Sequence, residues 1–87
     1  MSPEGAATGV RAVVEVLAKA LTDRPDVVRV TESQHRQVTL IELFVSPDDI
    51  GKLIGRQGRT VAALRTLAST AGEREGKTVT LEIRENR

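Results

Sequence analysis

The 87-residue sequence has no cysteine, tryptophan or tyrosine, and only one phenylalanine and one histidine. Without cysteine, the chain can form neither a disulfide framework nor a thiolate metal site. With one aromatic side chain, it cannot recognise a ligand mainly by stacking protein rings against it. One histidine and no cysteine also provide no set of nucleophile, base and orienting group, so we do not expect an enzyme.

Long apolar segments are missing as well. No stretch approaches the length that spans a membrane, and residues 1–5 lack the basic-then-apolar order of a secretion signal. The sequence has no internal repeat, low-complexity tract or linker, so we expect one small domain over residues 1–87. This domain is expected to lie in the cytoplasm, to bind no membrane and to need no cofactor or metal ion.

Charge is unevenly distributed, although the net charge is only +1. Residues 1–49 hold five Lys or Arg against eight Asp or Glu, whereas residues 50–87 hold eight against four. Between residues 50 and 68 there is no acidic residue, and the basic residues are Lys52, Arg56, Arg59 and Arg65. Such a segment favours an anionic partner, but it is also compatible with an ordinary solvated surface.

A glycine turn lies inside this basic segment. Gly55 and Gly58 flank Arg56 and Gln57, and apolar helical patterns stand on both sides. Glycine lets the backbone bend and approach a ligand closely, and a following helix directs its partly positive N-terminus to the same place. An ordinary turn between helices would explain one glycine, but not two together with Gly51 and the cations. The turn therefore predicts a phosphate-binding site.

Apolar spacing and turn residues predict the order of helices and strands. Pro25 ends the first helix, residues 33–36 form a hairpin loop, Ser46 caps the second helix, and Gly72 stops the third. The predicted elements are a helix at residues 5–22, strands at 27–32 and 37–45, a helix at 47–54, the glycine turn at 55–58, a helix at 59–71 and a strand at 77–84.

The element order and the segment from Asp49 to Thr60, which contains Ile54-Gly55-Arg56-Gln57-Gly58, resemble the K-homology (KH) domain family. The order helix, strand, strand, helix, helix, strand is that of its type II arrangement. The resemblance spans nearly the whole chain and is greatest for small bacterial RNA-binding members with a single KH unit. It implies an α+β fold, a three-stranded mixed sheet with helices packed on one face, and binding of single-stranded RNA.

The candidate RNA-binding residues surround the turn. They are Gly55, Arg56, Gln57 and Gly58 in the turn, Lys52 and Arg59 as cations, Gly51 before them, and Ile50 and Ile54 as an apolar floor under the bases. Leu53 and Val61 are further candidates for this floor, but helical spacing alone does not separate groove from core. Arg65 is as readily a solvated surface residue. The residues themselves do not distinguish RNA from single-stranded DNA.

The second strand is apolar on both faces. Ile41, Leu43 and Val45 lie on one face, and Val38, Leu40 and Phe44 lie on the other, where Glu42 interrupts them. One face must pack on the helices. For the other, burial or contact with another chain is favoured over a ligand groove.

Expectations about partners follow from the affinity of a single site and from the resemblance. Modest affinity for RNA makes a second linked site useful, which a dimer would supply. The resemblance implies a homodimer, or a heterodimer with a larger KH-containing protein of the Jag or KhpB type, in post-transcriptional control. Either the outer strand face or the motif region could form the interface. The alternative function is a KH-fold scaffold for protein association that binds RNA weakly or not at all.

A catalytic interpretation finds little support in the remaining polar residues. Asp48 and Asp49 could in principle bind a metal ion, but adjacent residues on a helix project in different directions. Capping of the second helix explains the two aspartates better. His35 falls in the predicted hairpin loop, away from them.

Overall fold

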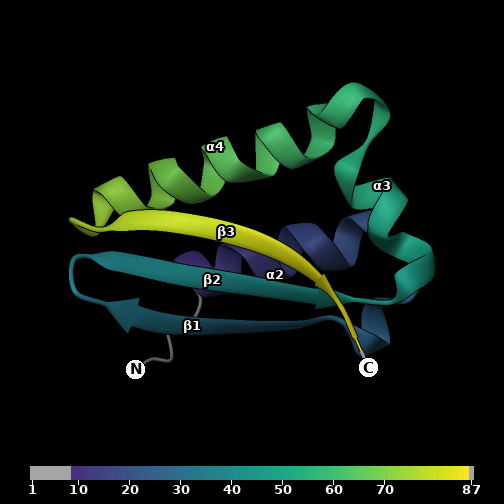
Figure 1. Ribbon diagram of the computed structural model, residues 1–87, viewed down its shortest axis with the longest axis horizontal. Coiled ribbons are helices and arrows are strands. Elements are labelled where there is room, and N and C mark those ends of the chain that lie inside the picture. Colours follow the sequence, from purple (N-terminus) through teal and green to yellow (C-terminus); the bar gives the residue numbers. More distant parts are fainter. Residues whose placement is uncertain (1–8, 87) are drawn as a thin grey trace.

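The computed structural model describes residues 9–86, which form a three-stranded sheet with helices packed on one face (Figure 1). In chain order the elements are α2 (Val10–Leu21), β1 (Arg29–His35), β2 (Val38–Val45), α3 (Ile50–Ile54), α4 (Arg59–Arg74) and β3 (Thr78–Glu85), with short 3-10 turns at Pro25–Val27, Pro47–Asp49 and Arg56–Gly58. This order confirms the predicted α+β class and its type II arrangement. None of the helices in the described part is long and apolar enough to cross a membrane.

The sheet has β2 at its centre and is mixed, as predicted. β1 pairs with β2 in antiparallel register, with Arg29 opposite Phe44, and β2 pairs with β3 in parallel register, with Val38 opposite Thr78. A parallel pair needs a long crossover connection, and α3 and α4 supply it. The glycine turn lies between these two helices, so the crossover that joins the parallel strands β2 and β3 also carries the candidate site.

The core lies between the inner face of the sheet and the helices. Ile41, Leu43 and Val45 are fully buried, which confirms that this face of β2 packs on the helices. The other buried apolar residues of the cluster are Val10, Val14 and Ala18 from α2, Val28, Leu53 from α3, Leu64 and Ala68 from α4, and Leu81 from β3. Burial of these side chains is the main force holding the helices on the sheet.

The outer face of β2 is partly covered by the chain's own charged side chains. The Arg29 guanidinium lies over the Phe44 ring at 5.1 Å from its centroid. Glu42 accepts a hydrogen bond from Arg84 Nε at 2.7 Å. Phe44 and Leu40 are half-buried, and Val38 is exposed near the hairpin. The half-burial of Phe44 therefore arises within the chain, without a partner.

The first strand differs from the prediction at both ends. It begins at Arg29, because Pro25–Val27 form a 3-10 turn, and it continues to His35 through residues assigned to the hairpin loop. The register pairs His35 with Val38, so the turn has only two residues, and the first of them has a φ of 60°. The polar residues at this end of the strand did not predict it, because the backbone hydrogen bonds between paired strands form without apolar side chains.

The helix α4 extends beyond Gly72 to Arg74, so the predicted stop at Gly72 is wrong. Gly72 is buried against β3, where an added Cβ would overlap the side chain of Val79 and lie 3.2 Å from the Lys77 carbonyl oxygen. Glycine is needed there for close packing of helix on strand. The turn that follows uses Gly76, which has a φ of 72°.

The first two helices also differ in extent from the prediction. The first helix, α2, ends at Leu21 and begins at Val10, and the predicted residues 5–8 lie outside the described residues. The predicted helix at 47–54 is divided into a 3-10 turn and α3. Ser46 caps this turn as predicted, because its side chain accepts a hydrogen bond from the Asp48 N–H at 3.3 Å.

Candidate nucleic-acid interface

The glycine turn has a backbone that ordinary residues rarely adopt. Gly55 has φ 77° and ψ 171°, Gln57 has φ 56° and ψ 26°, and Gly58 has φ 72° and ψ 16°. The Gly55 N–H donates to the Gly51 carbonyl at 2.9 Å and closes α3, and the Gly58 N–H donates to the Gly55 carbonyl at 3.1 Å. The chain thereby changes direction between α3 and α4, which begins at Arg59.

The two motif glycines are required for different reasons. The Gly55 conformation lies in a region that is essentially restricted to glycine, and a Cβ there would overlap the side chain of Thr60 and approach its backbone nitrogen to 2.9 Å. Gly58 has left-handed backbone geometry, but a Cβ would meet nothing within 4 Å. Gly51 lies in α3, and a Cβ added there would meet no atom within 4 Å. Its backbone therefore does not require glycine, but the missing side chain leaves open space on the surface of α3.

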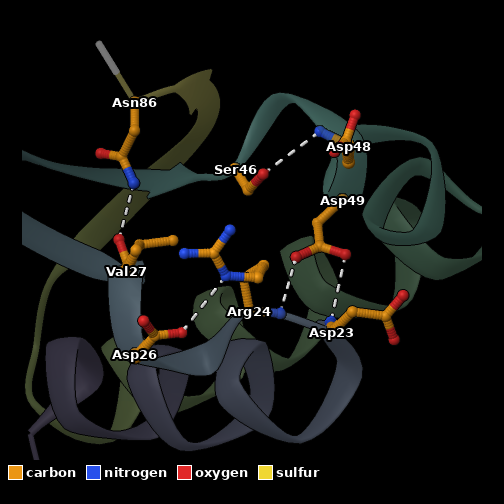
Figure 2. Close-up of polar contacts among 8 residues, drawn as sticks. All are labelled: Asp23, Arg24, Asp26, Val27, Ser46, Asp48, Asp49 and Asn86. Carbon is orange, nitrogen blue, oxygen red and sulfur yellow. Dashed lines mark hydrogen bonds and ion pairs between the residues drawn. The ribbon is translucent and has the colours of Figure 1, made fainter.

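A buried carboxylate fixes the approach to the turn. Asp49, which is 1% exposed, accepts hydrogen bonds from the backbone N–H groups of Asp23 at 3.1 Å and Arg24 at 3.0 Å (Figure 2). It makes no capping hydrogen bond to α3, so the prediction that both aspartates act as helix caps is wrong for Asp49. The carboxylate instead joins the end of α2 to the start of α3. Together with the fully buried Leu53, it holds the short helix in place.

The cations at the turn are exposed, and their partners differ. Lys52 Nζ lies 3.2 Å from the Asp23 carboxylate in an exposed ion pair. Arg56 and Arg59 form no ion pair within residues 9–86. Both stand at the N-terminal end of the 16-residue helix α4, whose dipole adds positive potential there. The site can therefore attract phosphate without first breaking a strong internal contact.

The apolar residues around the turn separate into core and surface. Leu53 and Val61 are buried and belong to the interior, and Ile50 is half-buried against the core. Ile54, the residue immediately before the turn, is 39% exposed. Of the predicted apolar floor, Ile54 is thus the residue that offers most surface to a ligand.

Arg65 has a contact that sequence reasoning missed. Its Nε–H donates to the Leu81 carbonyl oxygen of β3 at 3.3 Å, so the side chain crosses from α4 to the edge strand. The signal in the sequence was its position four residues after Val61, which places both residues on the same side of the helix. The partner could not be predicted, because it is a backbone atom in a distant strand.

An apolar groove of about 310 Å³ lies on another side of α4, against α2. Its lining residues are Leu17 and Leu21 from α2, and Arg59, Thr60, Ala63, Leu64 and Leu67 from α4. Leu21 is 42% exposed and Leu67 is 48% exposed. Leu67 stands three residues after the buried Leu64, at the spacing of an apolar helix face, yet much of its side chain stays exposed at this groove.

A three-stranded mixed sheet in this order, with a Gly-x-x-Gly turn between two crossover helices, defines a KH domain of type II. The comparison with family models agrees, since the model described as KhpA/KhpB, KH domain, matches residues 11–83. The chain belongs to the KhpA/KhpB family of KH domains.

Curated relatives are similar over most of their length. A protein named RNA-binding protein KhpA from Caldanaerobacter subterraneus subsp. tengcongensis is 49% identical over 71 residues, which cover 82% of this chain and 95% of that protein. The protein of the same name from Aquifex aeolicus is 49% identical over 73 residues, covering 84% of this chain and 92% of that protein. The Clostridium perfringens protein of this name is 45% identical.

Solved structures support the fold. A crystal structure of Aquifex aeolicus Era bound to GDP and AlF4⁻ matches 88% of this chain with a TM-score of 0.62 and 19% identity. A structure of Era in complex with MgGDPNP and nucleotides of 16S ribosomal RNA matches 87%, also with a TM-score of 0.62, at 20% identity. The chain spans about 30% of the first Era chain and 29% of the second. At this identity the likeness concerns the fold alone.

Proposed function

We propose that this domain binds single-stranded RNA by holding its sugar-phosphate backbone at residues 55–58. The observation that carries the proposal is the Gly55 backbone, which only glycine adopts readily and which directs Arg56 and Gln57 outward at the start of α4. Gln57 in the same turn has a φ of 56°, and a left-handed backbone at a residue other than glycine is often found at functional sites. The RNA-binding names of the relatives support RNA as the ligand.

In the proposed complex, phosphate groups lie at the turn and at the N-terminus of α4. Arg56 and Arg59 supply charge directly, and Lys52 exchanges its exposed contact with Asp23 for a phosphate oxygen. An exposed ion pair contributes little, so this exchange costs little. Bases next to the clamped backbone contact the exposed part of Ile54, and Gly51 leaves room beside them. The proposed activity is binding without chemistry, because these groups position a ligand and none is a nucleophile or base.

The proposal is tested by fluorescence anisotropy with a short labelled single-stranded RNA over a series of salt concentrations. If Lys52, Arg56 and Arg59 each neutralise one phosphate, log K should fall with log salt with a slope of about −2. The equivalent DNA is measured in parallel to determine whether the sugar matters. Absence of binding to the RNA at near-physiological salt would contradict the proposal and favour the scaffold function.

We further propose that the chain associates with a second KH domain, its own copy or a related one, through the groove between α2 and α4. The groove lining is predominantly apolar, and Leu21 and Leu67 remain about half exposed in it. Exposed apolar surface of this kind marks interaction sites. The outer face of β2 is a weaker candidate, because Arg29 covers Phe44 and Arg84 pairs with Glu42.

Charge substitutions in each surface separate these two interfaces. Leu67→Asp is expected to convert a dimer to a monomer in sedimentation velocity, because a carboxylate would have to be buried in the apolar groove. Leu40→Asp on the outer face should leave the dimer intact, as should the control Val16→Asp, since Val16 is 67% exposed on α2. A native protein that stays monomeric at high concentration, or a Leu67→Asp variant that still dimerises, would rule out the groove.

A further inference from the structure

The side chain of Arg65 connects α4, which begins at the proposed RNA site, to the strand β3. β3 is an edge strand, so the outer side of its backbone is not paired with another strand. Arg65 reaches this side and donates its Nε–H to the Leu81 carbonyl oxygen at 3.3 Å. The contact joins residues 16 positions apart and fixes the guanidinium beside the strand edge.

The rest of the guanidinium has no partner in the described part of the chain. The contact with Leu81 uses Nε, and neither terminal nitrogen makes a hydrogen bond or ion pair among residues 9–86. A guanidinium carries five N–H donors in a fixed plane, so four remain for a ligand. Because Nε is already held, the plane is oriented before a ligand arrives.

The position of Arg65 suits contact with a base. It lies seven residues after Gly58, which is about 10 Å along the helix axis, a distance that a strand of a few nucleotides covers. It lies on the side of α4 that faces β3, whereas Ala63 and Leu67 line the groove against α2. From the turn, a strand can therefore reach Arg65 along the side of α4 opposite Ala63 and Leu67.

We propose that Arg65 selects, at one position of the bound strand, a base with two adjacent hydrogen-bond acceptors. Guanine offers such a pair at O6 and N7, and cytosine offers one at O2 and N3, whereas adenine and uracil alternate donors with acceptors. A planar fork matches an adjacent pair of acceptors, and a lysine ammonium does not. The inference rests on the proposed RNA binding and adds a base preference to it.

The test compares short uridine-rich RNAs that carry a single guanosine, cytidine or adenosine at the central position, measured by anisotropy at one salt concentration. The native protein should bind the guanosine or the cytidine RNA about five- to thirty-fold more tightly than the adenosine and all-uridine RNAs. The first two RNAs distinguish the two acceptor bases. Arg65→Lys should abolish this ranking while keeping the affinity for the all-uridine RNA, because the charge is retained.

Arg74→Lys is the matched control, since Arg74 is an exposed arginine at the far end of the same helix, and it should keep the native ranking. Equal binding of all four RNAs by the native protein, or an unchanged ranking in Arg65→Lys, overturns the inference while leaving the RNA clamp intact. Failure of the native protein to bind any of these RNAs overturns both proposals.

Discussion

Replacing Arg56 and Gln57 together by aspartate is expected to lower the affinity for single-stranded RNA by about 100-fold or more. The two substitutions put negative charge where phosphate lies in the proposed complex, and like charges placed together at an interface cost several kcal/mol, with about 1.4 kcal/mol for each tenfold change in affinity. Both residues are exposed, and aspartate tolerates the left-handed backbone of position 57. The change should therefore affect binding without unfolding the domain, as measured by anisotropy and circular dichroism.

The chain contains its own control for this experiment. Arg36 and Gln37 form the same dipeptide in the turn between β1 and β2, where Arg36 also has a positive φ, at the opposite end of the sheet from α3 (Figure 1). Replacing both by aspartate changes the net charge by the same amount. This control should bind RNA nearly as the native protein does. Equal weakening by the two double substitutions would mean that general charge, and not the glycine turn, determines affinity.

Gly55→Ala is expected to destabilise the domain by about 2–4 kcal/mol, because it adds backbone strain and a steric overlap at the same atom. The φ of 77° and ψ of 171° place an alanine in an unfavourable region, and its Cβ would lie 2.9 Å from the backbone nitrogen of Thr60. In a domain of this size each kcal/mol lowers Tm by about 4–8 °C. Thermal and urea denaturation measure the loss.

Gly58→Ala is the matched comparison for the steric part of this effect. Its φ is 72°, so alanine is strained there, but a Cβ would meet no atom within 4 Å. We expect a cost of about 1–2 kcal/mol, clearly less than at Gly55. If the two alanine variants lose the same stability, the contact with Thr60 is relieved by a small shift and the two glycines are equivalent.

The sequence was sufficient to predict the structure where local signals agree with the pattern of burial. The order of elements followed from the spacing of apolar residues, from Pro25 and from Ser46, each of which acts within a few residues. The inner face of β2 followed from alternation. The turn was recognisable because two glycines and their neighbouring cations are contiguous in the chain.

The features that were missed depend on contacts between distant residues. Glycine commonly ends a helix, but Gly72 lies inside α4, where it packs closely against Val79. Aspartate commonly caps helices, but the carboxylate oxygens of Asp49 accept hydrogen bonds from the backbone N–H groups of Asp23 and Arg24, more than 20 residues earlier. Arg65 in α4 donates to a backbone carbonyl oxygen in β3. Local propensity contains no information on such partners, so these roles required the fold.

The buried carboxylate of Asp49 makes two amides of a connecting segment into reporters on the helix that precedes the glycine turn. Amides between a helix and a strand normally exchange their hydrogens with water quickly, because nothing protects them. Those of Asp23 and Arg24 are held by a side chain that belongs to the entry of α3. They can exchange only when the end of α2 separates from that entry. Their exchange rates therefore report how often the start of α3 separates from the segment that follows α2.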